Sequence, residues 1–152
     1  MVRLLPLPKG ISRAEYSRAL RNLPKTKIFA ARRILSKHGT EAVSPLSVFG
    51  LKALSLIEDH GDPGLKAIQT HGTVAFELRK LAGFPAVKVL SVLDPEEFAT
   101  LRNSFAHGID RLEYVAMANI IEHKGTDGFK ALLRNSDKLH KAIDANILGR
   151  TH

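Results

Sequence analysis

Apolar residues recur along the chain at the spacing of amphipathic helices. Between residues 12 and 23, and again between 26 and 38, they follow one another at intervals of three and four, which places them on one face of a helix. Ser12 and Glu15 have the spacing of a capping box, which predicts that the first of these helices begins here. Strand-like alternation does not persist anywhere in the sequence. We therefore predict an all-α protein.

The predicted helices are short and meet at tight corners. Four corners have His-Gly followed at once, or one residue later, by Thr or Asp: 38–40, 60–62, 71–73 and 107–110. The Lys-Gly-Thr of 124–126 is similar, and Gly83 and Asn135-Ser136 are weaker versions. We expect the glycine to adopt a left-handed conformation, the histidine to lie at the negative end of the preceding helix, and the Thr or Asp to cap the next helix.

The corners recur at a regular interval. Gly61, Gly72 and Gly83 are 11 residues apart, as are Gly125 and Ser136, and Gly39 precedes Gly61 by twice that interval. The interval differs from the 34 residues of a tetratricopeptide repeat and the 33 of an ankyrin repeat. We expect about nine or ten helices, most of them short, arranged either as a compact bundle or as a small curved helical-repeat array.

The composition excludes several classes of protein. The 152 residues include no cysteine, so a disulfide framework, a thiol nucleophile and a cysteine-ligated metal site are excluded. No segment reaches the roughly 18 uninterrupted apolar residues of a membrane-spanning helix, because Lys52 interrupts the longest candidate. We expect a soluble intracellular protein without a transmembrane segment. Its compartment stays open, with an organelle and a virion among the alternatives.

The positive charge is confined to the beginning of the chain. The formal net charge is +8, and residues 1–38 alone carry ten basic side chains against one acidic, a net +9. Residues 39–152 are close to neutral. We therefore divide the sequence into a basic arm with two amphipathic helices, 1–38, and a near-neutral helical body, 39–152, packed together as one domain.

Basic side chains concentrated in this way are typical of a surface that follows a phosphate backbone. Phe29 lies among them as a candidate stacking partner for a base, whereas Tyr16 heads the apolar stripe of its helix and is expected in the core. The predicted nucleic-acid-binding residues are Arg13, Arg18, Arg21, Lys25, Lys27, Arg32, Arg33 and Lys37.

The sequence indicates catalysis less strongly than it indicates nucleic-acid binding. His140 and Asp144 are four residues apart on the last predicted helix and could form an oriented general base, although such a pair is equally typical of a solvated surface. The histidines before the corner glycines are explained by their place at helix ends, and we predict neither a metal site nor a cofactor. Phosphate-loop and dinucleotide-binding patterns are missing, which favours a role without catalysis.

Three functions are compatible with these observations. The leading hypothesis is a small structural protein whose basic N-terminal helices bind RNA or DNA phosphates within a larger assembly, while the body contacts protein partners. A nuclease or toxin-like domain acting on nucleic acid is the catalytic alternative. The third is a helical-repeat scaffold whose basic arm meets an acidic protein or anionic lipid.

Overall fold

The computed structural model describes residues 6–150, and over this range it contains α-helices and 3-10 turns but no β-strand. The all-α prediction is confirmed. Residues 1–5 of the predicted basic arm lie outside the described residues. Contacts divide the chain into two compact units, Met1–Gln69 and Thr70–His152. The division into a basic part and a near-neutral part is one of charge and stays a prediction.

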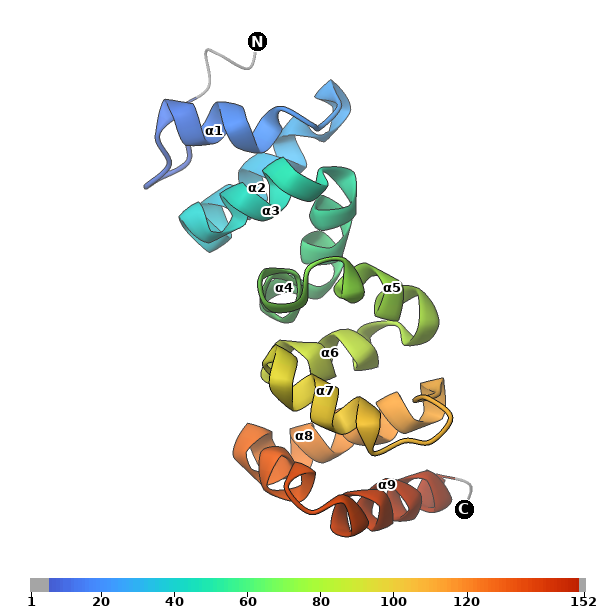
Figure 1. The fold of residues 1–152 in the computed structure, drawn as a ribbon. Helices are drawn as coiled ribbons and strands as arrows, with labels where there is room; N and C mark the ends of the chain where they lie inside the picture. The colour runs from blue at the N-terminus through green and yellow to red at the C-terminus, as the bar shows by residue number, and fades with distance from the viewer. Residues whose placement is uncertain (1–5, 151–152) are drawn as a thin grey trace. The chain divides into compact units, whose positions relative to one another are not determined.

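In the first unit a short helix packs across a pair of helices. Its elements are α1 (Arg13–Leu20), the 3-10 turn η2 (Lys25–Lys27), α2 (Ile28–His38), the 3-10 turn η3 (Gly39–Ala42), α3 (Val43–Phe49) and the first part of α4 (Leu51–His71). Helix α1 packs against α3 and α2, and Figure 1 shows it next to this pair. Tyr16, Leu35 and Leu46 are buried between these helices, so Tyr16 belongs to the core as predicted.

In the second unit the longest helix contacts most of the others. The elements are α5 (Thr73–Ala82), α6 (Phe84–Val92), α7 (Pro95–Asn103), α8 (Arg111–Leu133) and α9 (Ser136–Arg150). Helix α8 packs against α6 and α9, with smaller contacts to α5 and α7 (Figure 1). Tyr114, Met117 and Phe129 of α8 are almost completely buried, which makes this helix the centre of the unit's core.

Between residues 39 and 83, glycines with positive φ recur every 11 residues. Their φ angles lie between +58° and +70°, and they are Gly39, Gly50, Gly61, Gly72 and Gly83. Four of them are predicted corners, and Gly50 is the one that the sequence analysis missed. It fills the double interval between Gly39 and Gly61, so the repeat is continuous over five corners.

Each corner needs only its glycine, because that residue ends one helix and begins the next. The N–H of Gly50 donates to the Leu46 carbonyl at 2.9 Å, and its own carbonyl accepts from the N–H of Leu54 at 3.1 Å. Gly83 does the same with Arg79 and Val87, at 2.8 and 3.4 Å. A helical segment of ten residues plus one glycine gives the 11-residue interval, with no further linker.

The fourth residue of each 11-residue unit, counted from the glycine, is small and buried. It is Ala42, Ala53, Gly64, Ala75 or Ala86. At Gly64 an added Cβ would lie 2.7 Å from the carbonyl oxygen of Leu56, so the segments on either side of Gly61 approach too closely for a larger residue. Small residues at this position allow consecutive helices to pack tightly after a one-residue corner.

A second kind of helix start uses a capping box in place of glycine. Ser12 with Glu15 and Asp94 with Glu97 form the boxes that the sequence predicts, with both reciprocal hydrogen bonds present. Asp110 and Glu113 form a third. In all three the residue after the glutamate is a buried aromatic, namely Tyr16, Phe98 or Tyr114. The box therefore fixes the helix start and places a large ring in the core.

One local expectation is wrong. Thr40 and Thr73 do not cap the next element, because the corner places them inside it: η3 and α5 have no side-chain cap. Helices α4 and α8 span 21 and 23 residues, but each consists of two shorter helices that meet at a predicted corner, Gly61 in α4 and Gly125 in α8. At these two glycines the backbone leaves helical geometry for a single residue, so the corner bends the helix without a loop.

Candidate nucleic-acid interface

Helix α2 has one buried arc and one exposed arc. Ala31, Ile34 and Leu35 are buried, as the apolar spacing predicts. Phe29 lies on the other arc, with 63% of its surface exposed. Among the described residues its ring has no aromatic partner. The structure therefore leaves a large apolar ring in solvent on the face where the cations lie.

A shallow, open hollow of about 490 Å³ lies against this exposed arc. It is lined by Phe29, Arg32, Arg33, Ser36 and Lys37. These residues are spaced by one, three and four positions, so they share one side of the helix. Three of the eight predicted binding residues are thus brought together around the exposed ring.

Arg32 is tied to neighbouring structure. Its Nη1 donates to the Tyr16 hydroxyl at 3.2 Å and its Nη2 to the Pro6 carbonyl. The guanidinium also lies 5.7 Å from the centre of the Tyr16 ring, a cation–π distance. The sequence itself indicates that Arg32 contacts neighbouring structure, because it lies four residues after Ile28 and three before Leu35, at the edge of the apolar arc.

Arg33 forms an ion pair that leaves it accessible. Its Nη2 lies 3.1 Å from a carboxylate oxygen of Glu58, and the two side chains are 70% and 40% exposed. An exposed pair of this kind contributes at most about 1 kcal/mol. Glu58 therefore orients Arg33 over the hollow without occupying all five of its donors.

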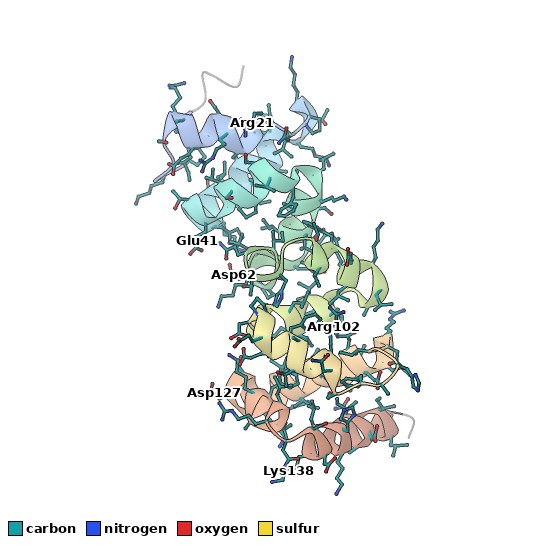
Figure 2. The ribbon with its side chains drawn as sticks, viewed as in Figure 1. Arg21, Glu41, Asp62, Arg102, Asp127 and Lys138 are labelled. Carbon is teal, nitrogen blue, oxygen red and sulfur yellow. The ribbon has the colours of Figure 1, made fainter. Side chains whose placement is uncertain are left out.

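The other predicted binding residues lie on α1, its C-terminal end and η2. Arg21, labelled in Figure 2, donates from Nη2 to the Ser47 hydroxyl at 3.2 Å. The positive charge of Arg18 helps to lower the pKa of Glu15, although hydrogen bonds from Ser12 contribute more. Of the eight predicted binding residues, five are exposed and have no side-chain hydrogen bond or ion pair to the described residues: Arg13, Arg18, Lys25, Lys27 and Lys37.

Two corner histidines contact other corners, a role that the sequence did not reveal. The His38 side chain is only 4% exposed, and its Nδ1 lies 3.0 Å from Asp62, just after the corner at Gly61. The Nε2 of His71 lies 3.0 and 2.7 Å from the carbonyl oxygens of Leu90 and Leu93, at the C-terminal end of α6. These histidines link corners that are 22 residues apart, which explains their position without a metal or a reaction.

The structure does not join the candidate catalytic pair. His140 Nε2 lies 3.2 Å from the Ser104 hydroxyl, and its ring packs against Phe105 at a centroid distance of 4.4 Å. Asp144 is exposed, and no hydrogen bond joins it to His140 in the described part of the chain. Ser104 donates to the carbonyl of Leu101 at 2.8 Å. His140 is therefore placed as a packing residue between α9 and the end of α7.

The second unit has a smaller hollow of about 220 Å³ with charges of both signs. It is lined by Glu96, Glu97, Thr100, Lys130, Leu133 and Arg134. Lys130 Nζ lies 3.3 Å from Glu97, and both side chains are roughly 70% buried, since 30% and 28% of their surface is exposed. Its acidic side chains oppose anion binding, in contrast to the hollow on α2.

No group of three or more His, Asp or Glu side chains within residues 6–150 is arranged to hold a metal ion. Over the same range no helix is both long and apolar enough to cross a membrane. Comparison with family models, curated sequences and solved structures finds no significant match to the chain. We therefore infer the function from the geometry of the chain itself.

Proposed function

We propose that this protein binds nucleic acid through its N-terminal basic helices and serves as a structural component of a larger assembly, such as a ribonucleoprotein, a nucleoid or a virion. The observation that carries the proposal is the exposed ring of Phe29 on the same face of α2 as Arg33 and Lys37. An aromatic ring can stack on a base, and the cations beside it can bind the neighbouring phosphates.

The charge distribution supports the proposal. Five cations between Arg13 and Lys37 are exposed and unpaired within the described residues, so phosphate contacts would not have to displace internal partners. Residues 1–38 carry net charge +9, which attracts a polyanion at long range and releases its condensed counterions on binding. A surface selected for solubility alone would mix both signs.

A helical-repeat scaffold is the second candidate. Val48 and Leu51 flank the corner at Gly50 and are 65% and 47% exposed. Apolar side chains at such a corner favour contact with a protein partner. This role is compatible with nucleic-acid binding by α2, and it replaces the first candidate if purified protein carries no nucleic acid at low salt. The chain has no Trp and two Tyr, so even a small nucleic-acid contamination changes its absorbance ratio at 260 and 280 nm.

The nuclease alternative receives less support. Because His140 contacts Ser104 and not Asp144, this pair does not form the oriented base that the alternative requires.

The salt dependence of binding tests the proposal on the full-length chain. Affinity for a labelled oligonucleotide is measured by fluorescence anisotropy over a range of salt concentrations. Wild-type protein should give a linear log–log dependence. A triple variant, Lys25→Gln, Lys27→Gln and Lys37→Gln, should reduce the slope by about 0.7–0.9 for each phosphate that the protein no longer neutralises, or roughly 2 units in all.

A matched control removes the same charge from the second unit. Lys124, Lys138 and Lys141 are exposed, and replacing all three by Gln should leave the slope unchanged. If both triple variants change the slope equally, the net charge of the whole molecule drives binding, and the proposal of an N-terminal interface is wrong. Absence of wild-type binding at low salt would also overturn the proposal.

A further inference from the structure

We infer that the hollow on α2 takes an unpaired strand, with one base stacked on Phe29 and neighbouring phosphates on Arg33 and Lys37. This inference rests on the proposed function and narrows it from nucleic acid in general to single-stranded nucleic acid.

The ring of Phe29 is exposed at the hollow. It lies on the polar arc of α2, where 63% of its surface is in contact with solvent, while smaller apolar residues of the same helix are buried. An isolated exposed apolar residue is ordinary on a protein surface, but this ring is part of the wall of a hollow whose other members are polar or charged. One face of the ring is therefore accessible in a site that already suits an anion.

Two cations follow Phe29 at regular spacing along α2. Arg33 follows Phe29 by four residues and Lys37 follows Arg33 by four, so the three side chains rise along the helix in steps of about 6 Å. Successive phosphates of an extended strand are separated by a similar distance. Ser36 lies between the two cations and adds a hydroxyl donor. The spacing of Phe29, Arg33 and Lys37 therefore matches that of a base and the phosphates that follow it.

An exposed ring on a helix surface favours an unpaired strand over a duplex. In a duplex the faces of the bases are stacked on one another, and only their edges are accessible from the grooves. A ring on the surface of a helix can reach a base face only where the base is unpaired, as in the aromatic platforms of single-strand binding proteins. Stacking favours no particular base, because every base has an aromatic face. The hollow should therefore tolerate sequence but discriminate against duplex.

Within the described residues, Glu58 is the acidic group that contacts this site, and it pairs with Arg33. The pair is 3.1 Å long and exposed. Arg33 has a planar fork of five donors, so it can keep one contact with Glu58 and donate others to a phosphate. Glu58 is thus a positioning residue for Arg33.

The test compares four probes with the full-length protein at one salt concentration: a 12-mer of uridine, a 12-mer of thymidine, a 12-base-pair duplex of mixed sequence and an abasic phosphodiester 12-mer. The variant Phe29→Leu keeps an apolar side chain and removes the ring. Because Phe29 is largely exposed, the fold should be retained, which the helical circular dichroism signal checks. The uridine and thymidine strands also separate RNA from DNA.

We expect wild-type protein to bind the single strands more tightly than the duplex or the abasic strand. Phe29→Leu should weaken single-strand binding by roughly 5- to 140-fold, the range expected for one stacked base, with an unchanged salt slope. Its affinity for the duplex and the abasic strand should not change. Phe29→Trp should keep the affinity and, as the only Trp in the chain, should lose fluorescence when a base stacks on it.

The outcomes separate this inference from the proposed function. If Phe29→Leu binds single strands like wild type, or if the duplex is bound equally well, stacking on Phe29 is wrong. The proposed function then still stands if the Lys-to-Gln variant loses salt dependence. If no probe binds at low salt, both the inference and the proposed function are wrong.

Discussion

Substitution of the corner glycines tests the 11-residue unit most directly. Gly61 has φ +64° and ψ −138°, a conformation that residues with a Cβ adopt only with strain. Such strain costs of the order of 1–3 kcal/mol, and Ala recovers about 0.4–1 kcal/mol by restricting the unfolded chain. An added Cβ would meet no atom within 4 Å at this position. Gly61→Ala should therefore lower the free energy of unfolding by about 1–2 kcal/mol, which is the backbone strain less the gain from restricting the unfolded chain.

Gly50 adds a steric contribution to the same strain. Its φ is +58°, and an added Cβ would lie 3.0 Å from the carbonyl oxygen of Asn22. The side chain of Asn22 donates to the Ser47 carbonyl, so displacing this residue also disturbs a hydrogen bond worth about 1 kcal/mol. Gly50→Ala should therefore cost about 2–3 kcal/mol, a large part of the 5–15 kcal/mol that is typical for a protein domain.

The assay is urea unfolding followed by circular dichroism at the helical minimum. Gly149→Ala is the matched control, because Gly149 lies in α9, has no atom within 4 Å of an added Cβ and has no positive φ. This variant should be neutral or more stable by up to about 1 kcal/mol, since Ala favours helix. If Gly61→Ala unfolds with the wild-type free energy, this glycine does not hold the strained corner in solution and the reasoning is refuted.

Three further predictions follow from the capping boxes and the buried groups. Glu15 has a lowered pKa, chiefly from the Ser12 backbone hydrogen bond, whereas burial raises the pKa of Glu113. Thermal unfolding should therefore show Glu15→Gln less stable and Glu113→Gln more stable than wild type at pH 7, and both differences should shrink as the pH falls and the wild-type carboxyls become protonated. Desolvation raises the pKa of Tyr114 to about 12, so stability should fall as the pH rises from about 10 to 12, and Tyr114→Phe should remove the late step in tyrosinate absorbance. His71→Ala leaves carbonyls at the end of α6 unpaired, and chemical denaturation should show a loss of about 1–3 kcal/mol; a smaller loss would mean that water replaces the ring.

Features that depend on neighbouring residues in the sequence could be predicted. The boxes at Ser12 and Asp94 have both partners within four positions, and the structure contains both. Most corner glycines were predicted from a flanking histidine or capping residue, and Gly83, which has neither, from its place 11 residues after Gly72. Gly50 was missed because its neighbours are Phe49 and Leu51, which have no such signal. Only the regular interval pointed to it.

Contacts between distant parts of the chain could not be predicted. Asp62 looked like a helix cap, but it lies against His38 of an earlier corner. His140 looked like a partner of Asp144 but contacts Ser104, 36 residues away. For the candidate site, the spacing of α2 correctly placed Ile34 and Leu35 on its buried arc. The hollow beside Phe29, and the attachment of Arg32 to Tyr16, depend on how α2 packs and so required the structure.

Because each corner consists of one residue, a chain of this kind can change in length without disturbing its packing only by whole 11-residue units. An insertion of one residue within a helical segment would rotate everything after it by about 100°, moving buried positions to the surface and the next glycine out of register. An insertion of 11 residues adds three turns and about 20°, and supplies a complete segment with its own glycine and small residue. A gene for such a chain would therefore lengthen or shorten by duplicating or deleting whole modules of about 33 nucleotides, and single-codon insertions should be confined to the segments without these corners.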